Sequence, residues 1–191
     1  MQVFNTRNEM VNALLPKESI GCEIGVLAGE FAQILYDSVK PKYFLLIDPW
    51  DLLTIKTSSG DHNGMNITSY NNVELYSKVT NQFKDSPSVK IVKEYSQNVL
   101  PTLPDASLDW IYIDGDHSYE GVRRDLLLCE SKIKPGGFIC GHDYELNRNK
   151  CNINWTCTTV KKAVEEFCPI YGWKVIAKAM DGMVSFALQK V

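Results

Sequence analysis

Short apolar runs of strand length alternate with longer amphipathic stretches along most of this sequence. The runs that indicate buried strands are Gly21–Gly25, Tyr43–Ile47, Val89–Val92, Leu108–Ile113 and Phe138–Cys140. The stretches with apolar residues at helical spacing are Glu30–Ser38, Val73–Phe83, Tyr119–Ile133 and Thr158–Phe167. Strands that alternate with helices in this way form a parallel sheet with helices on both faces. The sequence therefore predicts a doubly wound α/β fold of three layers, α/β/α.

Two further runs, Trp173–Ala177 and Met183–Leu188, are separated by the turn residues Met180-Asp181-Gly182. This pattern is typical of an antiparallel hairpin, which brings the expected sheet to seven strands. The chain has 191 residues, of which 45% are hydrophobic, enough for one sizeable core and too few for two ordinary domains. We therefore expect residues 1–191 to form a single domain.

Composition excludes several classes of function. The 20 Lys and Arg residues are outnumbered by 23 Asp and Glu, so a net charge of -3 provides no basic surface for nucleic acid. We find no run of about 18 apolar residues and no secretory leader, so we expect a cytoplasmic protein that does not bind membranes. None of the six cysteines forms a C-x-x-C pair, which favours reduced, packed thiols over zinc ligands or disulfides.

Two polar segments, Asp51–Asn72 and Glu145–Cys157, interrupt the alternation. Each follows the carboxyl end of a predicted strand, which is the edge where open α/β sheets bind ligands. Either segment could be a substrate lid or a plain surface insertion. The first contains His62, which we expect to be solvated, and the second contains Trp155, for which surface packing is the simpler interpretation.

A glycine turn follows the first predicted strand. The segment E-I-G-V-L-A-G-E-F-A begins at Glu23, and Asp48 lies at the tip of the next strand. Gly25 allows a tight turn, and Gly29 would let the backbone approach a ligand. The spacing differs from the G-x-G-x-x-G of dinucleotide sites, and Glu23 would repel a phosphate but attract a cation. Asp48 is placed where an acid hydrogen-bonds the hydroxyls of a ribose, although similar turns occur in many α/β folds.

Acidic and imidazole side chains cluster after the fourth and fifth predicted strands. Asp114 ends the fourth strand, and His142 and Asp143 follow the fifth. If these strands are neighbours, the three side chains meet at one edge and provide oxygen and nitrogen ligands for a divalent ion such as Mg²⁺. The alternative is that the acids cap helices or pair with the arginines of the following helix.

Taken in order, these motifs resemble a known family. The segments are E-I-G-V-x-x-G-E-F-A, I-D-P-W, I-D-G-D-H-S-Y-E-G-V-x-x-D-L and K-P-G-G-F-I-x-G-H-D-Y. They are similar to the class I S-adenosylmethionine-dependent methyltransferases, specifically the small-molecule O-methyltransferase branch that includes macrocin-type sugar methyltransferases, over residues 18–190. The resemblance implies a Rossmann-like fold, S-adenosylmethionine as the cofactor, and methylation of a hydroxyl on a sugar or other small metabolite.

The resemblance also implies roles for particular residues. The implied cofactor-binding residues are Glu23, Gly25, Gly29, Asp48, Tyr95, Ser96 and Asp114. The first three match the motif at the methionine part, Asp48 matches the acid that grips the ribose, and Tyr95 and Ser96 match positions beside the adenine. Asp114 also matches a magnesium-binding acid of metal-dependent relatives, whose site His142 and Asp143 would complete. Many of those relatives have an acid where His142 stands.

Methyl transfer requires a group that removes the acceptor's proton in a site that excludes water. The candidates for this base are His142 first, then His117 and Asp114, and a bound metal could lower the pKa of the acceptor hydroxyl instead. His117 could equally cap the helix that begins at Tyr119. Since little chain remains outside the cofactor-binding core, the acceptor site is either exposed or completed by a partner subunit of a homo-oligomer.

Two other functions fit the same residues: a metal- and cofactor-binding, hydroxylase-like protein of this fold, and a non-catalytic module that binds S-adenosylmethionine. Among the tryptophans, Trp50 could wall an adenine or substrate pocket. Trp110 and Trp173 lie in strand patterns, and we expect them in the core.

Overall fold

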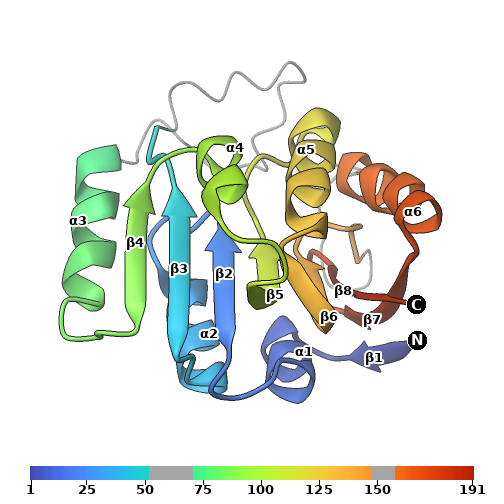
Figure 1. The fold of residues 1–191 in the computed structure, drawn as a ribbon, viewed down its shortest axis with the longest axis horizontal. Coiled ribbons are helices and arrows are strands. Elements are labelled where there is room, and N and C mark those ends of the chain that lie inside the picture. Colours follow the sequence, from blue (N-terminus) through green and yellow to red (C-terminus); the bar gives the residue numbers. More distant parts are fainter. Residues whose placement is uncertain (52–70, 148–157) are drawn as a thin grey trace.

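The computed structural model describes residues 1–51, 71–147 and 158–191, which form one sheet between two layers of helices (Figure 1). Its eight strands follow the order β1-β7-β8-β6-β5-β2-β3-β4 across the sheet. In chain order they are β1 (Gln2–Phe4), β2 (Ile20–Ile24), β3 (Tyr43–Asp48), β4 (Val89–Lys93), β5 (Leu108–Ile113), β6 (Ile133–Gly141), β7 (Trp173–Ala179) and β8 (Ser185–Lys190). The helices are α1 (Arg7–Leu14), α2 (Glu30–Val39), α3 (Asn72–Gln82), α4 (Ser96–Val99), α5 (Tyr119–Glu130) and α6 (Thr159–Tyr171), with a 3-10 turn at Leu100–Thr102.

The arrangement confirms the predicted doubly wound α/β/α fold and its antiparallel hairpin. All strand pairs are parallel except those of β8, which runs antiparallel to both β6 and β7. The structure adds one strand to the predicted seven, because β1 pairs in parallel with β7 at the rim of the sheet (Figure 1). β1 has three residues, two of them exposed, so it lacks the apolar run that marks the other strands in the sequence.

Side chains of the central strands alternate between two hydrophobic clusters on opposite faces of the sheet. On β5, Trp110 and Tyr112 face the side covered by α1, α2 and α3, and Ile111 and Ile113 face the side covered by α5 and α6. All four side chains are at most 5% exposed. A strand that is buried on both faces needs apolar residues at successive positions, which explains the continuous apolar runs. Trp173 is also buried, as predicted.

β6 begins earlier than the sequence predicts. α5 ends at Glu130 and β6 begins at Ile133, so Pro135-Gly136-Gly137 lies inside the strand instead of before it. The register between β5 and β6 shifts at this point. The extra residues form a bulge, and a bulge accommodates proline and glycine better than a regular ladder does.

The segment before β2 packs firmly on the rest of the fold. α1 buries Met10 and Val11 completely in the cluster shared with α2. The start of α1 is held by the turn between β7 and β8, where Asp181 Oδ2 accepts a hydrogen bond from the backbone N–H of Arg7 at 2.7 Å. The N-terminal residues therefore reach the carboxyl end of the sheet near the hairpin turn.

No helix of the described segments is long and apolar enough to cross a membrane. The cysteines of these segments, Cys22, Cys129, Cys140 and Cys168, are buried free thiols. His62, Trp155, Cys151 and Cys157, with most of the two polar segments, lie outside the described residues.

Candidate functional site

Four acids come together at the carboxyl edge of the sheet. Glu23 and Asp48 lie at the ends of β2 and β3, Asp114 directly follows β5, and Asp143 follows β6. These strands are parallel neighbours in the sheet, so their carboxyl ends meet at one edge, where α/β folds bind ligands. This edge is the candidate site.

The glycine turn after β2 is built by close packing. Gly25 has a φ of +84°, and its N–H donates a hydrogen bond to Ile47 O at 2.9 Å, which joins the turn to β3. A Cβ at Gly25 would lie 2.2 Å from the carbonyl oxygen of Asp114. Gly29, with a φ of +81°, is the N-cap of α2, and a Cβ there would meet side chains of α3. Gly29 therefore lacks a side chain because of the turn and the packing on α3. The sequence had instead suggested that this glycine lets the backbone approach a ligand.

Asp48 holds this turn through its carboxylate. Oδ2 accepts hydrogen bonds from the backbone N–H groups of Val26 at 2.8 Å and Leu27 at 2.9 Å. Oδ1 accepts one from the N–H of Trp50 at 2.6 Å. Burial raises the pKa of Asp48, and these hydrogen bonds oppose the rise. Since a carboxylate oxygen can accept two hydrogen bonds, Oδ1 keeps a lone pair for a ligand hydroxyl.

Trp50 does not present a face to a pocket, contrary to the prediction. Its side chain is 2% exposed, and its Nε1 donates a hydrogen bond to Leu27 O at 2.8 Å. Its ring centroid lies 5.0 Å from that of Tyr76 on α3. Trp50 is therefore a core residue that braces the glycine turn.

Glu23 is the most deeply buried acid of the site. It is 1% exposed, and its Oε2 has no hydrogen-bond partner among the described residues. Burial and the charge of Asp114 raise the pKa of Glu23 well above its usual value, while the charge of Arg7 lowers it. An unpartnered buried carboxyl is costly, so this oxygen is suited to a ligand that brings a cation or a hydrogen-bond donor.

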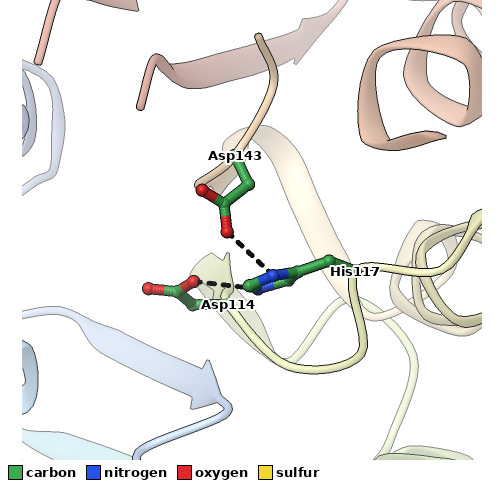
Figure 2. A group of neighbouring side chains, drawn as sticks. All are labelled: Asp114, His117 and Asp143. Atoms are coloured by element: carbon green, nitrogen blue, oxygen red, sulfur yellow. Dashed lines mark ion pairs between the residues drawn. The ribbon is translucent and has the colours of Figure 1, made fainter. Parts of the chain in front are cut away.

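Asp114, His117 and Asp143 lie in the segments that follow β5 and β6, and their side chains point toward one another (Figure 2). His117 Nδ1 lies 2.8 Å from Asp143 Oδ2, and His117 Nε2 lies 3.3 Å from Asp114 Oδ1. One ligand atom from each residue lies within 4.8 Å of the others, a spacing that could hold a metal ion. His117 Nε2 and Asp143 Oδ1 are buried without a well-aligned hydrogen bond to any described residue. Both are atoms that could ligate a metal ion.

His142 lies beside the same carboxylates. Its Nδ1 is 3.2 Å from Asp143 Oδ1 and 3.7 Å from Asp114 Oδ1. The structure thus brings together the three predicted metal ligands, Asp114, His142 and Asp143. It adds His117, which the sequence motifs indicated as a base and not as a ligand.

The two carboxylates hold His117 in its charged form. Burial alone would lower the pKa of His117, but the contacts with Asp114 and Asp143 outweigh this effect and raise the pKa well above its usual value. In the absence of a metal, His117 therefore carries a proton at neutral pH and cannot accept another. The alternative role of His117 as a helix cap is wrong, because Ser118 is the N-cap of α5 and its Oγ accepts a hydrogen bond from Gly121 N–H at 3.0 Å.

Arg7 enters the site from α1 and was not among the predicted site residues. Its Nη1 donates a hydrogen bond to Asp114 Oδ2 at 3.3 Å. Its guanidinium carbon lies 3.9 Å from the centroid of the Phe31 ring. The sequence offers one signal for it: Arg7 is the single basic residue among residues 1–16. Its position depends on the unpredicted pairing of β1 with β7.

The residues matched to the adenine side lie at the start of α4. Ser96 is buried, and its Oγ donates a hydrogen bond to Asp125 Oδ1 on α5 at 2.6 Å. Tyr95 precedes it and is 37% exposed. Asp125 is 1% exposed, and burial raises its pKa to about 6 against the opposing hydrogen bond from Ser96.

Asp125 makes the stability of the fold depend on pH. Its pKa is about 6 in the folded chain and about 3.9 in the unfolded chain, so the folded state binds the proton more tightly. The contribution to the free energy of unfolding, up to about 3 kcal/mol, is complete below pH 4 and is lost as the pH rises through 6. Between pH 4 and 7 we expect Asp125→Asn to lose less stability than the wild type. Urea unfolding at each pH measures the free energy of unfolding of both proteins. We expect the plot of this free energy against pH for the exposed control Asp37→Asn to run parallel to that of the wild type. A parallel plot for Asp125→Asn would contradict the prediction.

Comparison with known proteins places this site in a wider context. A model of a methyltransferase domain family matches residues 22–144, which are more than half of the chain and include the four acids and two histidines of the site but not Arg7. An uncharacterised protein of Acanthamoeba polyphaga mimivirus is 25% identical over 147 residues, which are 74% of this chain and 59% of that protein. The chain therefore spans about three fifths of the length of this relative.

Several solved structures share the fold. A protein of Corynebacterium glutamicum has a TM-score of 0.67 and 13% identity, with 96% of this chain and 80% of that one covered. A SAM-dependent methyltransferase of Aquifex aeolicus has a TM-score of 0.65 and 16% identity, with 98% and 91% covered. The N-methyltransferase NodS of Bradyrhizobium japonicum has a TM-score of 0.60 and 14% identity, with 96% and 94% covered. At these identities the likeness concerns the fold.

Proposed function

Because this chain belongs to the methyltransferase domain family, we propose that it uses S-adenosylmethionine to methylate a hydroxyl group of a small metabolite, such as a sugar, with the help of a divalent metal ion. The observation that carries the proposal is Glu23, a buried acid with an unpartnered oxygen beside a glycine turn. A turn that binds phosphate would be opposed by this carboxyl. A ligand with a sulfonium and an ammonium group would be favoured by it.

The residues proposed to hold the cofactor are Glu23, Gly25, Gly29, Asp48, Tyr95, Ser96 and Asp114. Bound there, S-adenosylmethionine would supply a methyl group made electrophilic by its sulfonium sulfur. The free lone pair of Asp48 Oδ1 would accept a hydrogen bond from a ribose hydroxyl, and the exposed ring of Tyr95 offers a face to the adenine. Gly25 keeps the turn close to the end of β5, and Gly29 keeps it close to α3.

Asp114, His117, His142 and Asp143 are the residues proposed to hold the metal ion. The two carboxylates suit a divalent ion such as Mg²⁺ or Mn²⁺, and of these two the imidazole nitrogens favour Mn²⁺. Such an ion would lower the pKa of the acceptor hydroxyl. The contacts with the two carboxylates raise the pKa of His117 well above its usual value, so binding of an ion must displace a proton before this imidazole can ligate.

As an alternative to ligating the ion, His142 is the residue proposed to take the acceptor's proton. Its Nδ1 lies 3.2 Å from Asp143 Oδ1, and this contact orients the ring. Nε2 is then the nitrogen proposed to accept the proton. A base that is oriented by a carboxylate is a common arrangement for proton removal. Asp114 is less suited to this task because its two oxygens already face Arg7 and the imidazoles.

Transfer of a labelled methyl group tests the proposed function. The purified protein is incubated with Mg²⁺, methyl-labelled S-adenosylmethionine and a panel of sugars and sugar-containing metabolites, with matched amines alongside. We expect label in a hydroxyl-bearing acceptor, as an ether that withstands mild base. Label in the amines alone would contradict O-methylation.

A further inference from the structure

Arg7 is the one charged side chain that α1 sends into the candidate site among the contacts that the structure describes. Its side chain is 27% exposed and lies against the Phe31 ring in the first turn of α2. Its backbone N–H is fixed by Asp181 at 2.7 Å. The residue is therefore held at its backbone by the hairpin turn and at its guanidinium by the helix that follows the glycine turn.

The charges around Arg7 alternate in sign. Asp114 lies on one side, with its Oδ2 at 3.3 Å from Nη1. Glu23 is near enough for the charge of Arg7 to lower its pKa, and its own Oε2 stays unpartnered and buried. An unpartnered acid beside a guanidinium that still has donors to offer is complementary to a zwitterion, which brings an ammonium and a carboxylate on one carbon atom.

We propose that Arg7 binds the α-carboxylate of the amino-acid part of S-adenosylmethionine, while Glu23 faces its α-ammonium group. The inference rests on the proposed function. The planar guanidinium has five donors in a fork, so the hydrogen bond to Asp114 leaves others for a second acceptor. Stacking on Phe31 fixes the plane of the fork and lowers the cost of ordering it.

Anchoring of α1 does not by itself account for Arg7. The helix is already held by Met10 and Val11, which are completely buried, and by the hydrogen bond to Asp181. Burial of the guanidinium lowers the pKa of Arg7, and the contacts with Tyr112, Asp114 and Glu23 outweigh this effect and raise it. The donors of the fork that these neighbours do not use would gain a partner in a ligand carboxylate.

Calorimetry with two cofactor analogues tests this role. S-adenosylhomocysteine carries the α-carboxylate, and its decarboxylated analogue keeps the ammonium but lacks the carboxylate. Hydrogen bonds between charged groups imply that the wild type prefers S-adenosylhomocysteine by about 10- to 100-fold. We expect Arg7→Gln to reduce this preference to about twofold or less, and Arg123→Gln, an exposed change on α5, to leave it intact. In Arg7→Lys, which keeps the charge without the fork, we expect an intermediate preference.

The outcomes distinguish a failure of the role of Arg7 from a failure of the proposed function. If Arg7→Gln and Arg7→Lys keep the full preference, or if the wild type has none, the role of Arg7 is overturned while the proposed function stands. If the wild type binds neither analogue, the proposed function itself fails. Thermal melts of each variant show that the folded protein is being titrated, and Arg7→Lys serves as the test if Arg7→Gln does not fold.

Discussion

Gly25→Ala is expected to destabilise the fold by about 2–5 kcal/mol. The left-handed backbone, with a φ of +84°, costs an alanine about 1–2 kcal/mol. The new Cβ would also lie 2.2 Å from the carbonyl oxygen of Asp114 and 2.6 Å from Gly115 Cα, so the end of β5 must move away from β2. For a chain of this length such a loss lowers the melting temperature by about 10 °C. Calorimetric or circular dichroism melts measure it.

Gly136→Ala is the matched control for this prediction. Gly136 has a φ of +81°, almost the same as that of Gly25, but a Cβ there would meet nothing within 4 Å. It should therefore show the backbone cost alone, about 1–2 kcal/mol. Equal losses in the free energy of unfolding of the two variants would contradict close packing of the glycine turn on the end of β5.

Asp143→Asn is expected to lower the rate of methyl transfer by at least about a hundredfold. The substitution removes the charge that lies 2.8 Å from His117 Nδ1 and 3.2 Å from His142 Nδ1. The proposed base then loses its orienting carboxylate, and the proposed metal site loses one of its two acids. Asparagine tolerates the positive φ of 55° at this position, so the backbone change is small. The labelled-methyl assay with saturating cofactor gives the rate.

The affinity for S-adenosylhomocysteine separates chemistry from binding in this variant. We expect it to change by less than about threefold, which is 0.65 kcal/mol, since Asp143 is not among the proposed cofactor residues. Chelation of divalent ions should slow the wild type and have little further effect on Asp143→Asn. A variant that transfers methyl groups at the wild-type rate would remove Asp143 from both proposed roles, and Asp37→Asn controls for the loss of a carboxylate elsewhere.

The central strands could be predicted from the sequence because they are buried on both faces. β5 carries Trp110 and Tyr112 for one core and Ile111 and Ile113 for the other, and this double demand leaves a continuous apolar run. β1 does not need a continuous apolar run, since it pairs through only three residues at the rim of the sheet. The bulge of β6 could not be predicted because Pro135-Gly136-Gly137 has the composition of a turn.

The site could be predicted where it follows from parallel pairing. Glu23, Asp48 and Asp114 lie at or directly after the carboxyl ends of their strands, so the topology alone brings them to one edge. Arg7 could not be found in this way, because its place depends on a long-range contact with the hairpin turn at Asp181. The role of Asp48 in holding the turn, through three backbone N–H groups, is likewise a matter of local geometry that strand patterns do not encode.

Titration of S-adenosylhomocysteine into the wild-type protein tests the central claim most directly, because product binding requires the proposed cofactor site and neither the acceptor nor the metal ion. The proposal predicts saturable binding of one molecule per chain, weakened in Glu23→Gln, and no binding of NAD⁺, whose pyrophosphate the buried acid would repel. Absence of S-adenosylhomocysteine binding by the folded wild type, or tighter binding of NAD⁺, would contradict it.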